Sequence, residues 1–370
     1  MKVDFANLSK QTQRYQQELS NAMQEVVDNS AFIMGAQVQQ LEQALVQYCG
    51  VNHAIACGSG TDALLLSLMA LDIQPGDEVI TTPFTFFATA EVIAFLKAKP
   101  VFVDIVPQTY NIDVSKIEQA ITDKTKVIMP VSLYGQPANM TEINQLAEKH
   151  QLTVIEDAAQ SFGAMYQDRM SCNLSSIACT SFFPAKPLGC FGDGGAAFTS
   201  DEALAKKIQS LRVHGQTARY QHSYIGMGGR LDTLQAAVLL VKLKHYPQDL
   251  LRRQEVAKLY SELLTDVSDK ITLPFVETDR TSAWAQYSIR VNNREEVQAT
   301  LREKGIPTAV HYPIPLHFQE CFKYLGYQPG AFPVSEAVCK EIMSLPMNPD
   351  LTIEEISYVA EQLKLAISQA

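Results

Sequence analysis

The sequence has few features that would cross-link the chain through disulfides or zinc, or direct it out of the cytoplasm. Its seven cysteines are odd in number and form no C-x-x-C pair, which argues against a disulfide framework and a zinc ribbon. We expect free, buried thiols in a reducing compartment. The first residues lack the apolar core of a signal peptide, and the longest apolar run, residues 63–73, is too short to span a bilayer. These absences predict a soluble, cytoplasmic protein without a membrane partner.

An excess of positive charge is missing as well. The 40 acidic residues outnumber the 30 lysines and arginines, for a net charge of -10, so we expect no nucleic-acid partner. The sequence has no evident low-complexity segment or internal repeat, and its hydrophobic content of 46% is ordinary for a globular protein. A chain of 370 residues is long enough for two domains and a large core.

Apolar runs alternate with helical patterns through the first two thirds of the chain. Strands that are apolar throughout and separated by helices are typical of a mostly parallel sheet covered on both faces. Near Arg230 the pattern changes to a long amphipathic helix, followed by a polar helix around residues 249–264. We therefore predict an α/β fold, with a large domain that includes an N-terminal helical segment over residues 1–240, and a smaller α+β domain over residues 241–370. Strands are expected at residues 53–57, 78–82, 100–105, 127–133, 153–156, 177–183, 196–199, 285–291 and 308–311, and further helices at residues 62–71, 88–97, 114–121, 140–150 and 353–367.

The first stretch with chemical potential is CGSGTDALLL, residues 57–66, where an expected strand ends in a Gly-Ser-Gly turn and a helix begins. Such a turn directs backbone N–H groups at an anion, and the helix N-terminus adds partial positive charge. Gly60 and Thr61 are therefore candidates for a phosphate site. The same residue types also cap helices without any ligand, so the stretch alone leaves both interpretations open.

A second stretch, TVIEDAAQSFGA at residues 153–164, runs from an apolar strand directly into Glu156 and Asp157. Ligands of parallel sheets bind beyond the carboxyl ends of the strands, and an acid buried there needs a partner. A protonated pyridine nitrogen is such a partner, and a protonated pyridine ring is the electron sink that pyridoxal-phosphate (PLP) chemistry requires. A helix cap or a metal ligand is the alternative. No histidine accompanies the two acids, so we expect no metal.

A third stretch places Lys186 between two prolines in SFFPAKPLGCFGDGG, residues 181–195. A single lysine usually lies on the surface. Among apolar neighbours, however, its pKa falls and the amine becomes nucleophilic, as a Schiff-base lysine requires. Ser181 is a candidate phosphate donor in the same stretch. An aromatic ring of TTPFTFFATAE, residues 81–91, at another strand end, could stack on a flat cofactor, although core packing is the stronger interpretation of this stretch alone.

Together, these residues fall at strand ends of one predicted sheet, and the motifs around them resemble a known family. EDAAQSFGA, SFFPAKPLGCFGDGGA and GRLDTLQAA are similar to the DegT/DnrJ/EryC1/StrS family of sugar-nucleotide aminotransferases, over nearly the whole chain. The resemblance implies a fold-type I PLP-dependent transferase, similar to aspartate aminotransferase, that forms a homodimer with active sites at the interface. It also implies which residues bind PLP. Lys186 forms an imine with the cofactor, and Asp157 pairs with its pyridine nitrogen. Gln160 lies on the side of the phenolic oxygen, Phe86 stacks on the ring, and the phosphate is held by Gly60, Thr61 and Ser181.

The chain departs from the family at one position. Members of the family reach the phosphate with an asparagine from a loop of the partner subunit. In this chain the corresponding stretch reads IGMGGRLD, and Gly228 stands where the asparagine is expected. The resemblance therefore supplies no side-chain donor at this point.

Other segments suggest a substrate. PVSLYGQ, SCNLSSIACTSFF and TAVHYPIPLH look most like family members that aminate C3 of UDP-2-acetamido-2-deoxy-3-oxo-D-glucuronate for bacterial surface polysaccharides. The resemblance implies L-glutamate as amino donor, 2-oxoglutarate as its product, and a ping-pong mechanism in which Lys186 moves the proton. Arg230 is our candidate for binding the uronate carboxylate, because a guanidinium binds carboxylates through two hydrogen bonds. His311 and Tyr312 are further substrate-binding candidates.

Three alternatives remain open from the sequence. The enzyme could aminate C4 of a 4-keto-6-deoxy nucleotide sugar, since only the substrate side distinguishes the two reactions. A PLP-dependent dehydratase of the same fold typically replaces the lysine by histidine, so Lys186 argues against that reading. The third alternative is a non-enzymatic binding or regulatory protein that keeps the fold but forms no imine.

Overall fold

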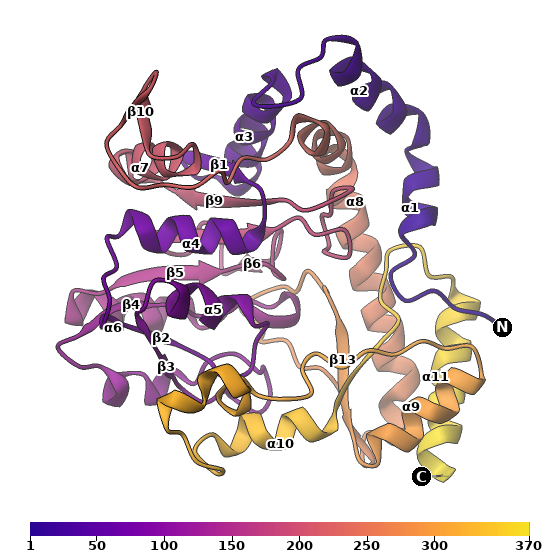
Figure 1. Cartoon of the computed structure of the whole chain (residues 1–370). Helices are drawn as coiled ribbons and strands as arrows, with labels where there is room; N and C mark the ends of the chain where they lie inside the picture. Colours follow the sequence, from indigo (N-terminus) through magenta and orange to yellow (C-terminus); the bar gives the residue numbers. More distant parts are fainter. Residues whose placement is uncertain (370) are drawn as a thin grey trace.

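A seven-stranded sheet forms the centre of the large unit in the computed structural model, which describes residues 1–369 (Figure 1). The strand order is β3-β2-β4-β5-β8-β9-β1. Neighbouring strands are parallel except β9, which runs antiparallel to both β8 and β1. The bounds are β1 His53–Cys57, β2 Glu78–Thr81, β3 Lys99–Phe102, β4 Thr125–Ile128, β5 Thr153–Asp157, β8 Ile177–Ser181 and β9 Gly195–Thr199. The predicted α/β architecture with a mostly parallel sheet is confirmed.

Helices cover both faces of this sheet, because alternate residues of each strand point to opposite sides and nearly all of them are apolar. Side chains such as Ile55, Val127 and Ile155 pack under α4, α5 and α7. Their neighbours on the strands face α3 and α8 at one end of the sheet and α6 at the other. The bounds are α3 Ala36–Cys49, α4 Gly60–Ala70, α5 Ala88–Phe95, α6 Met140–His150 and α7 Glu202–Arg212.

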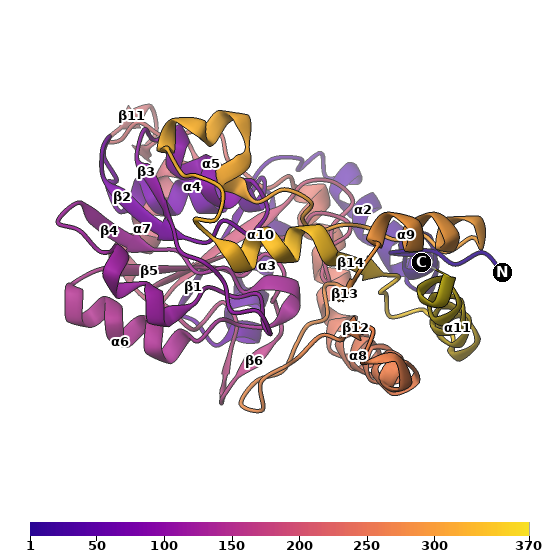
Figure 2. The same ribbon diagram turned by 90° about the horizontal axis from the view of Figure 1, so that it is seen from below.

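A smaller unit with its own core lies around the lower half of α8, to the right of the sheet in Figure 1. The antiparallel strands β12, β13 and β14 pack with α9 and α11, and Val3 near the N-terminus joins this core. Helix α10 packs on loops of the large unit and leads directly into β14 (Figure 2). The bounds are β12 Ile271–Thr272, β13 Tyr287–Val291, β14 Ile342–Leu345, α9 Arg294–Glu303, α10 Pro333–Glu341 and α11 Ile353–Gln369.

Helix α8, Thr233–Leu264, joins the two units as one continuous rod. The sequence suggested two helices, because a proline inside a helix removes one hydrogen bond and crowds the preceding turn. The structure keeps Pro247 inside α8, and the two halves of the helix are buried in different cores. The free energy gained by burying both halves of α8 is larger than the local cost of Pro247 inside the helix. The boundary expected between residues 240 and 241 falls inside this helix, and the division into two domains stays a prediction.

Other local expectations differ from the structure. Residues 114–121 form two short 3-10 turns rather than an α-helix, with the Asp113 side chain capping the first. In the stretch 308–311, only Ala309 makes a strand-like bridge, to Ser344, because prolines flank this stretch closely. Helices α1 Leu8–Arg14 and α2 Gln16–Asp28 lie in the N-terminal segment that was expected to be helical. The short strands β6 Met165–Tyr166, β7 Arg169–Met170, β10 Gln216–Ala218 and β11 Gln221–His222 were not foreseen from the pattern.

Within residues 1–369, no helix is long and apolar enough to cross a bilayer. In the same part of the chain, no group of three or more histidine, cysteine or carboxylate side chains is arranged to hold a metal ion. All seven cysteines are free thiols, and all except Cys321 are buried.

Candidate active site

The carboxyl ends of β1, β5 and β8 meet at one edge of the large sheet. Cys57, Asp157 and Ser181 are the last residues of these strands, so the three candidate stretches from the sequence begin at the same edge. This is the edge at which open α/β sheets bind their ligands.

Asp157 is the carboxylate at this edge, and only 5% of its surface is exposed. Its Oδ2 accepts a hydrogen bond from Thr89 Oγ1 at 2.8 Å, and its Oδ1 accepts one from the backbone N–H of Ala159 at 3.2 Å. Burial raises the pKa of Asp157, while the bond from Thr89 and the charge of Lys186 oppose that rise. Among the residues that the structure describes, no cation lies within ion-pair distance of this buried carboxylate. The site therefore suits a cationic partner from a ligand.

Glu156, the other acid of the pair, has a different role. Its side chain points away from Asp157 into the protein, where Oε1 accepts hydrogen bonds of 2.8 Å from Ser132 and Ser171. Its Oε2 accepts the backbone N–H of Cys172 at 3.0 Å. These bonds satisfy a fully buried carboxyl group whose pKa is raised by burial. Glu156 therefore holds together the loops beneath the site.

Lys186 lies half-buried in the loop after β8. Burial among protein atoms lowers the pKa of its amine, and the negative charge of Asp157 partly offsets that effect. Within the described chain, the amine has no hydrogen-bond or ion-pair partner. The loop is tightly turned around it: the N–H of Lys186 donates to the Phe183 carbonyl at 2.8 Å, and a Cβ at Gly189 would collide with the backbone of Pro184. A lysine with a lowered pKa and an unengaged amine is suited to attack a carbonyl group.

The turn between β1 and α4 forms a cradle for an anion. Ser59 caps α4 by accepting the N–H of Asp62 at 3.0 Å, which leaves the N–H groups of Gly60 and Thr61 without acceptors inside the helix. A Cβ at Gly60 would stand 2.7 Å from the Cβ of Ser181, so the helix N-terminus and the end of β8 touch only because this residue is glycine. This contact brings together the three residues that the sequence suggested as phosphate ligands.

The neighbouring strand makes the cradle still tighter. A Cβ at Gly195, the first residue of β9, would stand 2.6 Å from the backbone nitrogen of Gly60. Any side chain at Gly195 would therefore push the turn away from the sheet. The cradle is built from backbone held at close approach, as anion-binding turns require.

Aromatic and amide side chains form a wall around Gln160. Gln160 donates from Nε2 to the Tyr312 hydroxyl at 3.2 Å, and its Oε1 accepts the backbone N–H of Tyr134 at 2.7 Å. The Tyr134 hydroxyl donates to the carbonyl of His311. Phe86 lies 6.1 Å from the Tyr312 ring between centroids and is 56% exposed, so one face of it is open to a flat ligand.

His311 stands at the same wall with its side chain half-buried. Its Nδ1 lies 2.9 Å from Ser344 Oγ. Burial, and to a smaller extent the charge of Lys186, lowers the pKa of His311 to about 4. The ring is therefore neutral at physiological pH, and it is a hydrogen-bonding group rather than a charged ligand for an anion.

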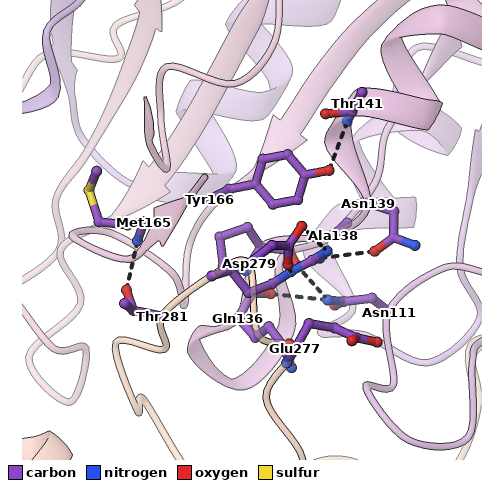
Figure 3. A network of polar contacts seen from close by, with 12 residues as sticks. Asn111, Gln136, Ala138, Asn139, Thr141, Met165, Tyr166, Glu277, Asp279 and Thr281 are labelled. Atoms are coloured by element: carbon purple, nitrogen blue, oxygen red, sulfur yellow. Dashed lines mark hydrogen bonds and ion pairs between the residues drawn. The ribbon is translucent and has the colours of Figure 1, made fainter. Parts of the chain in front are cut away.

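A strap from the small unit, residues 274–285, lies against the loop around Gln136 (Figure 3). The Gln136 amide donates to the Phe275 carbonyl at 2.9 Å and accepts the N–H of Glu277 at 2.8 Å. Arg280 donates to the Pro137 carbonyl at 2.8 Å. The strap thus fixes the loop that carries Tyr134, and through Tyr134 it fixes Gln160 and His311.

Arg230 lies apart from this wall. Its backbone forms a bridge with Cys57, and its guanidinium lies 3.8 Å from the point where a Cβ of Gly228 would stand. The same point is 3.3 Å from His214 Nε2, so the imidazole fills the space beside Gly228. No contact between described residues joins Arg230 to His311 or Tyr312. The Arg230 carbonyl lies 3.2 Å from the point where a Cβ of Gly58 would stand, so within one chain Arg230 lies beside the anion turn and apart from the residues around Gln160.

Sequence reasoning missed three residues at the site. Thr89, on α5, supplies a hydrogen bond to Asp157, and Tyr134 connects Gln160 with His311. The Phe5 ring lies 6.4 Å from the His311 ring, so the N-terminal segment reaches the site. None of the three lies in a motif that identifies its partner, because each meets the site through the tertiary fold.

These residues fit PLP. The buried Asp157 carboxylate lacks a cation, and a protonated pyridine nitrogen would supply one. The cradle at Gly60, Thr61 and Ser181 offers N–H and hydroxyl donors to a phosphate, and the Lys186 amine has the lowered pKa that an imine-forming lysine needs.

Comparison with known proteins also indicates a PLP-dependent aminotransferase. A sequence profile of the DegT/DnrJ/EryC1/StrS aminotransferase family matches residues 13–364. The chain is 48% identical over 361 residues to UDP-2-acetamido-2-deoxy-3-oxo-D-glucuronate aminotransferase of Pseudomonas aeruginosa, covering 98% of this chain and 99% of the relative. It is 46% identical to a pleiotropic regulatory protein of Geobacillus stearothermophilus, with 98% of each chain covered.

A solved structure extends the likeness to the fold. NtdA from Bacillus subtilis, with bound cofactor PMP, superimposes with a TM-score of 0.93 at 34% identity, over 100% of this chain and 86% of the other. The expected fold class of fold-type I PLP-dependent transferases is confirmed by this likeness and by the sheet described above. The chain therefore belongs to the DegT/DnrJ/EryC1/StrS aminotransferase family.

Proposed function

We propose that this chain is a PLP-dependent aminotransferase that transfers the amino group of L-glutamate to C3 of UDP-2-acetamido-2-deoxy-3-oxo-D-glucuronate. The observation that carries the catalytic part is the placement of Lys186, with an unengaged amine of lowered pKa, near a buried Asp157 that lacks a cationic partner. Both lie at the edge of the sheet where the anion cradle also opens.

The residues of the chain divide the work among them. When bound, PLP supplies an electron sink for the carbon atom that bears the reacting nitrogen. Asp157 keeps the pyridine nitrogen protonated, and Gly60, Thr61 and Ser181 hold the phosphate. Because burial lowers its pKa, the Lys186 amine is able to take a proton from the donor and return it to the acceptor as general base and acid.

The substrate part rests on likeness and on one arrangement of residues. The Pseudomonas aeruginosa relative, at 48% identity, carries the name of this reaction. Neutral His311 and the hydroxyl of Tyr312 stand at the wall around Gln160 and are suited to hydrogen-bond sugar hydroxyl groups. In this proposal Arg230 binds the uronate carboxylate.

Arg230 lies apart from His311 within one chain, so the proposal includes a homodimer in which Arg230 approaches the site of the partner copy. Side chains close to it in sequence are exposed and apolar, with Ile225 at 93% and Tyr220 at 81%, which supports a buried interface there. A cytoplasmic location, expected from the sequence, stays a prediction.

A regulatory role is the competing possibility, and the Geobacillus stearothermophilus relative carries such a name. A protein that only binds a ligand has no need of a lysine with a lowered pKa next to a buried acid. The complete set of catalytic groups therefore favours the enzyme.

The test offers the PLP-loaded protein L-glutamate with either the 3-oxo uronate or a 4-keto-6-deoxy nucleotide sugar, and measures 2-oxoglutarate and the amino sugar by mass spectrometry. We expect product from the uronate alone, and none from Lys186→Ala. Preferred amination of the 4-keto sugar would show that the substrate is wrong. A protein that neither binds PLP nor forms either product would show that the enzyme assignment is wrong.

A further inference from the structure

The Lys186 amine is positioned by its loop alone. Within the described chain it has no hydrogen-bond or ion-pair partner, so its direction depends on the backbone that carries it. That backbone closes on itself at the base of the loop, where the N–H of Cys190 donates to the Phe182 carbonyl at 2.8 Å. The loop, residues 182–191, is short and closed, so any group that holds its second half also restrains Lys186.

Two side chains of α8 hold the second half of this loop. Gln235 accepts the N–H of Phe191 on its Oε1 atom at 2.8 Å. Lys242, about two helical turns further along α8, donates from Nζ to the Gly189 carbonyl at 2.7 Å. The ammonium group of Lys242 also lies 5.0 Å from the centroid of the Phe191 ring. One cation therefore contacts the loop both at a carbonyl group and at an aromatic ring.

The charge of Lys242 has no carboxylate next to it. Lys242 is 5% exposed, and among residues 1–369 no acid lies within ion-pair distance of its amine. Its other acceptor is Gln11 Oε1 at 3.0 Å, and the Nε2 of Gln11 donates in turn to Asp249 at 3.2 Å. A buried ammonium group is costly unless polar groups compensate it, and here the neutral groups of the loop and of α1 do so. The contacts with the loop therefore give this buried charge a physical reason.

We infer that Lys242 is a positioning residue for Lys186, which holds the Gly189 carbonyl and so fixes the loop from which the catalytic amine extends. This inference rests on the proposed function, in which Lys186 is the reacting amine. A displacement of about 1 Å at a reacting group costs on the order of 100-fold in rate, so one buried hydrogen bond under the loop is sufficient to affect turnover. Through Gln11, the same contact links the loop to the docking of α1.

The test compares variants that act on this contact with one that does not. Lys242→Met removes the charged donor and keeps the length of the side chain. Lys242→Arg restores a charged donor, and the groove that Lys242 lines gives the larger group room. The matched control is Lys244→Met on the same helix, because Lys244 is exposed and pairs with Glu18 of α2 at 2.8 Å rather than with the loop.

Two measurements report on the loop without any substrate. Hydrogen exchange of the PLP-free protein follows the backbone of residues 182–191, and borohydride reduction with peptide mass spectrometry gives the fraction of PLP linked to Lys186. We expect this segment of Lys242→Met to exchange about tenfold faster, as the loss of a hydrogen bond from a charged group implies, and the link to form more slowly. Lys242→Arg should return both values toward those of the parent protein, and Lys244→Met should leave them unchanged.

A lower melting temperature of Lys242→Met with parental exchange and link formation would overturn the inference, because Lys242 would then only fasten α1 to α8. If Lys242→Met does not fold, Gln11→Leu decides. It removes the acceptor that directs the Lys242 amine and should speed exchange in the same segment, and unchanged exchange would overturn the inference. A parent protein that links PLP but does not aminate the uronate refutes the proposed substrate and leaves this inference standing, whereas one that links no PLP refutes both.

Discussion

The hydrogen bond from Thr89 to Asp157 allows a quantitative prediction for the PLP-free protein. Thr89→Val keeps the shape of a side chain that is only 1% exposed and removes the donor 2.8 Å from Asp157 Oδ2. A hydrogen bond to a charged group contributes about 1.5–3 kcal/mol, so the ionised carboxylate becomes less stable in the fold by that amount. The loss of this bond therefore raises the pKa of Asp157 further.

The sign of the effect with pH follows from linkage. The folded pKa of Asp157 is already raised by burial, so the ionised carboxylate destabilises the fold at high pH, and this loss is relieved as pH falls through the folded pKa. Urea unfolding followed by circular dichroism should therefore show Thr89→Val to be about 2 kcal/mol less stable than the parent near pH 8, where the carboxylate is ionised, and clearly less different in acid, below the folded pKa of Asp157.

The matched control is Thr85→Val, which removes the 3.1 Å bond between the two threonine hydroxyls and leaves the donor to Asp157 in place. It should show little difference between the two pH values. A destabilisation by Thr89→Val that is the same at both pH values would refute the argument, because it would mean that the lost hydroxyl does not act on the ionised carboxylate.

Three further predictions concern other parts of the site. Lys186→Ala should lose the visible absorption of the protein–cofactor link and at least about 10³-fold in turnover, measured with bound PLP. The folded pKa of His311 is about 4 against 6.5 when unperturbed, so stability should fall as pH drops between these values, and His311→Asn should make the melting temperature fall less steeply there. Gly135→Ala should destabilise the protein by more than about 2 kcal/mol in urea unfolding and shift the fluorescence of Trp284. The new Cβ would stand 2.5 Å from the backbone nitrogen of Trp284, and the φ of Gly135, +116°, is unfavourable for alanine.

The sheet could be predicted from the sequence because each of its strands is a short apolar run that ends in a turn. Once these strands are taken as parallel, their carboxyl ends must share an edge, so Asp157, Ser181 and the turn at Gly60 could be expected close together. The different directions of Glu156 and Asp157 follow from the two-residue period of a strand, although the pattern alone does not tell which side faces the ligand.

What could not be predicted depends on contacts between distant segments. The sequence around Thr89 reads as an ordinary apolar helix, and nothing in it indicates a bond to a carboxylate 68 residues away. The continuity of α8 through Pro247 contradicts the local rule for proline, since burial in two cores decides it. The separation of Arg230 from His311 likewise depends on where the small unit sits, which periodicity does not encode.

Helix α8 also limits how the protein tolerates insertions. It has 32 residues and so measures about 48 Å, and its two halves belong to different cores. One residue inserted at its middle would rotate everything beyond that point by about 100° around the helix axis and advance it by about 1.5 Å. The small unit would then carry His311 and Tyr312 away from Gln160, while the sheet stayed intact. The length of α8 therefore fixes the rotation of one half of the active site relative to the other. Insertions in this helix should be tolerated less well than insertions in the surrounding loops.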